Sequence, residues 1–306
     1  MKMKRFVSVA LTVLMLLPIL AGCGAKTETP VATAAPAPAA TEAPAAAPAE
    51  TTAAAALAED VQKIVDRGVL RVGVKNAVLG FGFQDELTGE YSGMEISLAQ
   101  KIAEYLGVDV EFTAVTAATR TELLDSGDID CVLATFTITE ERKKSWDFTT
   151  PYYTDYVTVL VEDASGIKTL ADLKDKKVGV SSGSTSAKAL VKAMIEAGVI
   201  SGDGFDADTF DPATWTDGVS FAQYDDYPTI STALSAGEVD AFCVDKSILA
   251  VYHTDGRSYI DDKFSPQEYG IATTKGSGMS QLCETLITGW LADGTIDALI
   301  AENGIA

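Results

Sequence analysis

The chain of 306 residues contains only four cysteines and a single histidine. Cys131, Cys243 and Cys283 lie far apart and are odd in number, which argues against a disulfide framework. Their spacing matches no zinc site, so we expect all three to be buried as small hydrophobic residues. His253 has no second histidine or cysteine nearby, so neither a metal site nor a catalytic triad is predicted around it.

Positive charge is also scarce, because 23 lysines and arginines stand against 44 aspartates and glutamates, for a net charge of −21. Nucleic acids and anionic membrane surfaces repel such a chain, so we expect neither as a partner. Any anionic ligand must be bound by a local cluster of cations. The acidic run 203–208 has its glycine and glutamate misplaced for a calcium loop, so we predict a solvated loop and no metal or other cofactor.

The apolar run from Phe6 to Leu17 is too short to span a bilayer and follows a basic start. This pattern predicts a secretory signal peptide over residues 1–22. Residues Leu20 to Cys23 resemble the lipobox of bacterial lipoproteins. The resemblance implies that Cys23 becomes a diacylated, palmitate-bearing N-terminus, and that the protein lies outside the cytoplasm, anchored by lipid to the outer face of the cell membrane. The alternative is an ordinary signal peptide with a chance cysteine.

Residues 23–56 are nearly all alanine, proline, threonine and glutamate, a composition that cannot bury a core. We predict a semi-extended disordered tether, with the folded part beginning near Leu57.

From Leu57 onward, helical and strand patterns alternate, which predicts an α/β fold of parallel sheets with helices on both faces. About 250 folded residues favour two such lobes. Strands are expected at 70–74, 110–115, 129–134, 178–180 and 239–244, and helices ending at Gly107, opening with a capping box at 119–122, and covering 279–291.

A weak internal repeat supports two lobes. Residues 124–130 recur as 234–240, each a helix end, a glycine and a buried strand. Thr135 and Asp245 follow at the same distance, at the carboxyl ends of their strands. Open α/β sheets bind ligands at that edge, so we expect both residues to face one cleft.

The stretch Ala134-Thr135-Phe136-Thr137-Ile138-Thr139-Glu140-Glu141-Arg142-Lys143-Lys144 resembles the polar amino-acid solute-binding proteins of ABC importers, family 3. Trp146-Asp147-Phe148, Pro151-Tyr152-Tyr153, Gly93-Met94-Glu95 and Tyr269-Gly270-Ile271 extend the likeness. Ser97 departs from the aspartate that is usual in the family, at a position expected to lie far from the cleft.

The resemblance implies a two-lobe periplasmic-binding-protein type II fold. Lobe 1 would comprise 57–154 and 270–306, and lobe 2 would comprise 155–269. Two crossover strands near 155–160 and 264–269 would act as hinges. The implied function is capture of an amino acid by lobe closure and its delivery to the transmembrane subunits of an ABC permease, by a monomer that is not an enzyme.

Within the family, the chain looks most like the aspartate/glutamate-binding branch. Val72-Gly73-Val74-Lys75-Asn76, Ala118-Thr119-Arg120, Tyr227-Pro228-Thr229-Ile230 and Asp245-Lys246-Ser247-Ile248-Leu249 carry this closer likeness. Val78 and Ala117 stand where the glutamine binders of the family place stacking aromatic residues.

The resemblance assigns Arg142 to a ligand α-carboxylate, which a guanidinium grips through two parallel bonds, and Asp245 to the α-ammonium. Thr139 is expected to cap the helix after it, whose dipole would add positive potential. Lys75, at the end of a strand, and Arg120, at the start of a helix, are predicted to neutralise a side-chain carboxylate. The alternative for Lys75 is an exposed lysine after a strand, and the alternative for Arg142 is a surface arginine beside Lys143 and Lys144.

Thr135, Thr137, Thr185 and Tyr227 complete the predicted ligand site. Thr185 belongs to the loop Ser181–Ser186, which is typical of a backbone anion nest opening a helix. Tyr227 precedes a proline at the start of a helix, where core packing is an equal alternative.

Three alternatives remain open from sequence. The same fold could bind cystine or another polar amino acid, it could be a dehydratase acting on prephenate-like acids, or it could serve as a sensor or adhesin module.

Overall fold

The structure, a computed structural model, describes residues 57–305. The predicted signal peptide, the lipidated Cys23 and the tether at 23–56 lie outside the described residues. Within 57–305, no helix combines the length and apolarity that a membrane crossing requires.

The first of two large sheets forms around β1, whose apolar residues are predicted to lie in a buried parallel sheet. β5 and β6 pair with β1 in parallel, β14 is antiparallel to β6, and β7 is antiparallel to β14. The strand order is β5 (Asp109–Ala114), β1 (Val69–Val74), β6 (Cys131–Leu133), β14 (Ala272–Thr274) and β7 (Trp146–Phe148).

The second sheet repeats this plan. β9 pairs in parallel with β10 and β11, whereas β8 is antiparallel to β11, β12 and β13. The strand order is β10 (Val219–Tyr224), β9 (Lys176–Ser181), β11 (Ala241–Asp245), β8 (Tyr153–Glu162) and β12 (Arg257–Tyr259), with β13 (Phe264–Tyr269) also on β8.

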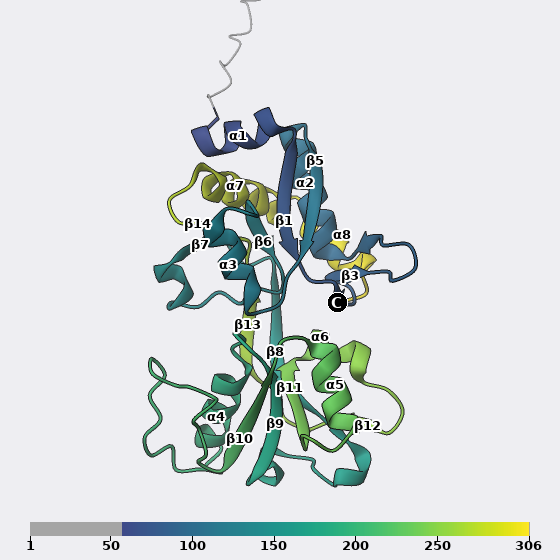
Figure 1. Ribbon diagram of the computed structural model, residues 1–306, viewed down its shortest axis with the longest axis vertical. Helices are drawn as coiled ribbons and strands as arrows, with labels where there is room; N and C mark the ends of the chain where they lie inside the picture. Colours follow the sequence, from purple (N-terminus) through teal and green to yellow (C-terminus); the bar gives the residue numbers. More distant parts are fainter. Residues whose placement is uncertain (1–56, 306) are drawn as a thin grey trace, which may run out of the picture. The chain divides into compact units, whose positions relative to one another are not determined.

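Two antiparallel strands connect the sheets. β8 carries the chain from the first sheet into the second, and β13 returns it beside β8 (Figure 1). The predicted parallel strands are confirmed, but both sheets are mixed, because the connecting chain must run back against the strands it joins. The division into lobes at 154/155 and 269/270, and the hinge role of 155–160 and 264–269, stay predictions.

Helices cover both faces of each sheet, as predicted. On the first sheet, α3 lies on one face, and α1, α2, α7 and α8 pack together on the opposite face. On the second, α4 and α5 pack on opposite faces. The helices are α1 (Glu59–Arg67), α2 (Met94–Leu106), α3 (Thr119–Ser126), α4 (Ser186–Glu196), α5 (Tyr227–Ser235), α6 (Lys246–Leu249), α7 (Gly278–Ala292) and α8 (Thr295–Glu302).

Shorter elements complete the described chain. A small sheet joins β2 (Ala77–Val78), β3 (Gly82–Gln84) and β4 (Tyr91–Ser92). Single 3-10 turns occur at η1 (Arg142–Lys144), η2 (Asp163–Ser165), η3 (Leu170–Leu173) and η4 (Ala250–Tyr252).

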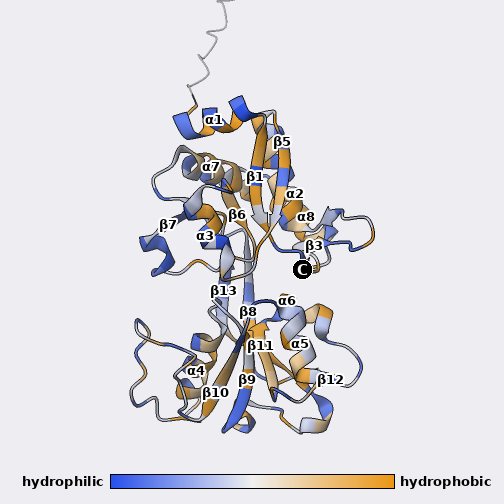
Figure 2. Ribbon diagram, in the orientation of Figure 1, coloured by the Kyte–Doolittle hydropathy of each residue, from blue (hydrophilic) through white to orange (hydrophobic). Residues whose placement is uncertain are grey.

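The cores follow the two-residue period of a strand. Cys131 and Leu133 pack on one side of β6, and Val132 on the other. Figure 2 accordingly shows β1, β6 and β11 largely in orange, the colour of hydrophobic residues. Cys131, Cys243 and Cys283 are free and buried, which confirms their predicted role as small hydrophobic residues.

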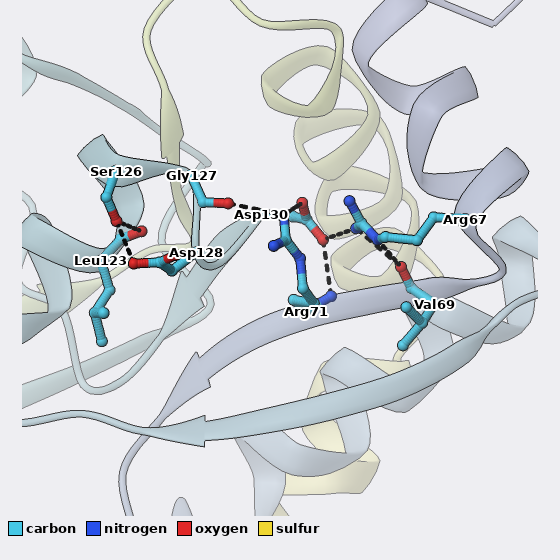
Figure 3. A network of polar contacts seen from close by, with 8 residues as sticks. All are labelled: Arg67, Val69, Arg71, Leu123, Ser126, Gly127, Asp128 and Asp130. Carbon is cyan, nitrogen blue, oxygen red and sulfur yellow. Dashed lines mark hydrogen bonds and ion pairs between the residues drawn. The ribbon is translucent and has the colours of Figure 1, made fainter.

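The internal repeat has a structural basis in two aspartates. Asp130 accepts a bond from the Arg71 backbone N–H at 2.8 Å, and its own N–H donates to the Arg71 carbonyl (Figure 3). Asp240 makes the same two bonds with Lys177. Each aspartate therefore fixes the register at which the strand after the repeat joins its parallel neighbour. Asp130 also binds the side chains of Arg67 and Arg71.

One local prediction was wrong. The helix α3 does not open with a capping box at Thr119, because its N-cap is Ala118. Reciprocal bonds instead join Thr116 and Thr119: each hydroxyl oxygen accepts from the other residue's N–H. The acidic run 203–208 is a loop with exposed aspartates, as predicted, and Phe205 within it packs against Phe210 and Trp215.

Gly93 fixes the start of α2 against the small sheet. Its φ is 122°, and a Cβ there would lie 2.2 Å from the carbonyl oxygen of Phe81. That atom is backbone and accepts a bond from the N–H of Glu95, so it cannot move aside easily. Only glycine fits this crossing of chains.

We predict that Gly93→Ala lowers the free energy of unfolding by about 3–5 kcal/mol, because the substitution adds a backbone clash to an unfavourable φ. Gly89→Ala is the matched control, since Gly89 also has a positive φ, but a methyl group added there would meet no atom within 4 Å. We expect Gly89→Ala to lower the free energy of unfolding by about 1 kcal/mol. Urea unfolding measures both, and equal losses would show that the close approach to Phe81 is unimportant.

Candidate functional site

The predicted ligand residues converge where the two large sheets face each other. Lys75 follows β1, and Asp245 ends β11, so both lie at the carboxyl edges of parallel strands. The Lys75 ammonium lies 5.3 Å from the centre of the Tyr227 ring, which opens α5 on the second sheet. Arg120 begins α3, close enough to Asp245 to interact electrostatically with it.

Two of the three cations in the site are deeply buried. Lys75 and Arg120 are each 3% exposed, while Arg142 is partly buried. The alternative for Lys75, an exposed lysine, is therefore wrong. Burial of a charge without compensation is costly, so such an arrangement needs a partner of opposite charge.

An aromatic ring and backbone carbonyls position the two guanidinium groups. The Phe136 ring lies 3.7 Å from the Arg120 guanidinium carbon and 4.6 Å from that of Arg142. Arg120 Nη1 donates to the Ala134 carbonyl at 2.9 Å, and Arg142 Nη1 donates to the Thr137 carbonyl at 2.7 Å. These contacts fix both cations in place without neutralising their charge.

No carboxylate neutralises these cations directly. Among residues 57–305, none of the ion pairs within 4.0 Å involves Lys75, Arg120 or Arg142. Burial, and then repulsion by Arg120, hold the pKa of Lys75 well below its usual value. Burial likewise lowers the pKa of Arg120 to about 10 and that of Arg142 to about 9. Burial is the first cause of each shift, and the attraction of carboxylates such as Asp245 offsets it only in part.

Asp245 forms the acidic end of the site. Its Oδ2 accepts a 2.5 Å bond from the Tyr269 hydroxyl, which also lies 3.3 Å from Asp155. Burial, with repulsion from Asp155, raises the pKa of Asp245 to about 7. A cation placed beside Asp245 would favour its charged form.

Glu95 is a second buried carboxylate, which belongs to one of the family motifs but to which the sequence assigned no role. It accepts from the Tyr152 hydroxyl at 2.5 Å and from the Thr135 N–H at 2.7 Å, both through Oε1. Its Oε2 is buried without a hydrogen-bond partner among the described residues, and burial raises its pKa. A glutamate within the apolar face of a helix is the sequence signal that could have identified it.

Thr135 is held in a strained backbone conformation. Its φ of 45° lies in the left-handed region, which is costly for a β-branched residue. Its hydroxyl is buried and has no hydrogen-bond partner within 57–305. The bond from its N–H to Glu95 holds this turn, which aims the chain after β6 into the site.

Thr137 and Thr185 meet at a residue that the sequence did not single out. Both hydroxyls donate to Oε1 of Gln267, at 2.9 and 2.7 Å. Thr137 follows the first sheet, Thr185 precedes α4 on the second, and Gln267 belongs to β13. Contacts from both sides therefore converge on this strand.

Two further expectations need correction. Thr139 does accept a bond from the Arg142 N–H, but the helix it caps is the single turn η1, too short to supply a helix dipole. In the Ser181–Ser186 loop, the Gly183 carbonyl accepts a 3.0 Å bond from Arg142 Nη2. At this point the loop offers an acceptor rather than the predicted anion nest.

A cleft of about 620 Å³ lies beside Arg142. Phe136 and Ala117 line it from the first-sheet side, and Thr185 and Lys188 from the other. Ala117 and Val78 are both buried and small, so no aromatic clamp stands at these positions.

These features define a ligand-binding protein of the two-sheet α/β class, with a polar site between the sheets. The chain belongs to the bacterial extracellular solute-binding proteins, family 3, whose model matches residues 70–302. This membership places the protein outside the cytoplasm and confirms the predicted family and the periplasmic-binding-protein type II fold.

Curated relatives and solved structures agree with this membership. The chain is 31% identical to the glutamine-binding protein of Geobacillus stearothermophilus, over 89% of this chain and 93% of that one. It is 32% identical to the L-cystine-binding protein TcyJ of Escherichia coli (strain K12), over 78% and 84%. An ancestral arginine-binding protein bound to arginine matches with a TM-score of 0.64 and 35% identity, over 77% and 98%.

We predict that Lys75→Met stabilises the ligand-free protein by about 1–3 kcal/mol at pH 7, because a buried amine without an anionic partner is replaced by an apolar chain of similar size. The unfolded state binds a proton that the buried Lys75 releases, so the wild type gains stability as pH rises toward 10.5. The advantage of Lys75→Met should therefore shrink by up to about 1.4 kcal/mol per pH unit.

Urea unfolding at pH 7 and pH 9 measures this difference. Lys174→Met is the matched control, because Lys174 is exposed, and its substitution should change stability little at either pH. A destabilised Lys75→Met variant would mean that Lys75 is already compensated within the folded chain.

Proposed function

We propose that this protein binds L-aspartate or L-glutamate and delivers it to the permease of an ABC importer. The observation that carries the proposal is the buried Lys75 ammonium, which lies beside Arg120 and has no carboxylate within 4.0 Å in the described part of the chain. A ligand carboxylate at this position would supply the missing anion.

The charge balance supports an acidic ligand. When all are ionised, Lys75, Arg120 and Arg142 stand against Glu95 and Asp245, which leaves a net charge of +1 among these five groups. Asp155, a further buried carboxylate beside Asp245, is counted apart because it already accepts bonds from the Tyr156 N–H and from the N–H and hydroxyl of Ser247. An acidic amino acid carries a net charge of −1 near neutral pH, so the closed site would be neutral. A neutral amino acid would leave one buried charge uncompensated, at a cost of several kcal/mol.

Each end of the ligand has a candidate partner. Arg142 would bind the α-carboxylate with the N–H groups that its carbonyl contacts leave free. Asp245 would bind the α-ammonium, and Lys75 and Arg120 the side-chain carboxylate. Thr135, Thr137, Thr185 and Tyr227 would complete the site, with the Tyr227 ring facing the Lys75 ammonium.

Transport requires that the site open and close. We infer hinge motion in β8 and β13, which connect the sheets, with the ligand stabilising closure by binding residues on both sides. We also infer that Cys23 is lipidated, so that the tether at 23–56 holds a monomeric binding domain near its permease.

A second candidate is binding of cystine or another uncharged polar amino acid. It is favoured by the relatives, which are named for glutamine and L-cystine. Such a ligand offers no side-chain carboxylate to Lys75, and no aromatic clamp stands at Val78 or Ala117 to hold a bulkier side chain.

Isothermal titration calorimetry against the twenty amino acids separates the two candidates. We expect binding of L-aspartate or L-glutamate, weakened at least about a hundredfold in Lys75→Met, because a buried charge–charge contact is lost. Lys174→Met should bind as the wild type does. Tight binding of L-cystine or L-glutamine, unaffected by Lys75→Met, would contradict the acidic assignment.

The pH dependence of binding tests the role of Asp245. Without ligand its pKa is about 7, so below that pH the ammonium must displace a proton, and affinity should fall. Lys75 contributes with the opposite sign, because its lowered pKa means that acid restores its charge. The ratio of wild-type to Asp245→Asn affinity cancels this contribution.

We predict that this ratio falls about twentyfold from pH 7.5 to pH 5.5, as a carboxyl of that pKa becomes protonated. Calorimetric titrations at the two pH values measure it. A ratio that is constant with pH would show that Asp245 does not bind the ammonium.

A further inference from the structure

Gln267 is a buried polar residue at the centre of the site and is only 2% exposed. It lies on β13, directly opposite Asp155 of β8, so it belongs to the pair of strands that connect the sheets. Its amide is shielded from water and makes its hydrogen bonds with Thr137, Thr185 and Ser265.

The orientation of the amide follows from its contact with Ser265. Gln267 Nε2 lies 2.9 Å from the Ser265 carbonyl oxygen and 3.2 Å from the Ser265 hydroxyl. A carbonyl oxygen only accepts hydrogen bonds, so the NH₂ group of the amide must face it. The backbone holds this acceptor in place, because Ser265 has a φ of 49° and sits in a bulge between Phe264 and Pro266.

The opposite end of the amide determines where two hydroxyl protons point. Gln267 Oε1 faces both Thr137 Oγ1 and Thr185 Oγ1, and an amide oxygen cannot donate. Each hydroxyl has one proton, and each must direct it at Oε1. Only lone pairs then remain on the two threonine oxygens for a ligand.

We propose that Gln267 is a positioning residue that makes the hydroxyls of Thr137 and Thr185 acceptors, and thereby selects a ligand with an ammonium group. The proposal rests on the proposed binding of an amino acid. Lone pairs favour an N–H donor and disfavour a carboxylate, so the carboxylates are left to Lys75, Arg120 and Arg142.

The bridging geometry adds a condition to this selection. The two threonines approach Oε1 from opposite sides of the site, one after β6 and one before α4. Both hydroxyls are oriented at once only while the two sides are in contact, so the preference for an ammonium is a property of the closed form.

The test compares L-aspartate with succinate, which has both carboxylates but no ammonium, in calorimetric titrations of the full chain. In Gln267→Leu the hydroxyl protons are free to turn toward the ligand. We expect aspartate to bind about tenfold to a hundredfold more weakly, as for a lost bond to a charged group, while succinate binds as well as before or better. The aspartate-to-succinate preference should shrink accordingly.

Thr185→Val provides a second variant if Gln267→Leu does not fold, because it removes one hydroxyl and keeps the shape of the side chain. Thr185→Val should also weaken the binding of aspartate and leave the binding of succinate unchanged. Gln281→Leu, on the exposed side of α7, is the matched control and should change neither affinity. Equal weakening of both ligands in either variant, or no weakening of either, would overturn the proposal.

The outcomes separate this proposal from the proposed function. If the wild type binds L-glutamine but not L-aspartate, acidic specificity fails, and the same comparison is made with L-glutamine and its deamino counterpart, glutaramate. If aspartate binds but the preference survives Gln267→Leu, only the role of Gln267 fails. If no amino acid binds, both proposals fall.

Discussion

Burial of positive charge inside an acidic protein is the constraint on which the rest of the site depends. Lys75 and Arg120 have left water, and repulsion between them adds to the cost of their burial. The chain tolerates this because the large apolar cores on both sheets supply stability elsewhere. In the proposed site, binding of an anion would relieve this unfavourable state.

The repeated strand-and-helix unit explains why the charged groups meet. Asp130 and Asp240 fix the registers of β6 and β11 at the ends of those strands remote from the site. Thr135 and Asp245 then emerge at matching positions at the other ends. Each sheet presents its own set of groups, and the paired strands β8 and β13 connect the two sheets.

Residues without a charge of their own set the polarity of the site. The Phe136 ring contacts both guanidinium groups, and Gln267 receives the protons of two threonine hydroxyls. The Tyr269 hydroxyl donates to Asp245 and leaves the remaining lone pairs of that carboxylate for a ligand. The Phe136 ring and the Tyr269 hydroxyl thus position Arg120, Arg142 and Asp245, and such preorganisation reduces the reorganisation that binding requires.

Periodicity and motif spacing in the sequence were sufficient to predict the alternating α/β elements, the family, and the residues that gather at the strand ends, because these depend on local patterns and on where parallel strands terminate. The sequence could not reveal the antiparallel pairing of β8 and β13, the bonds from Thr135 and Tyr152 to Glu95, or the link through Gln267 between Thr137 and Thr185. These contacts join residues more than 35 positions apart, and only the packed chain brings them together. Local patterns thus decide which groups are present, and tertiary structure decides which protons and charges they present to a ligand.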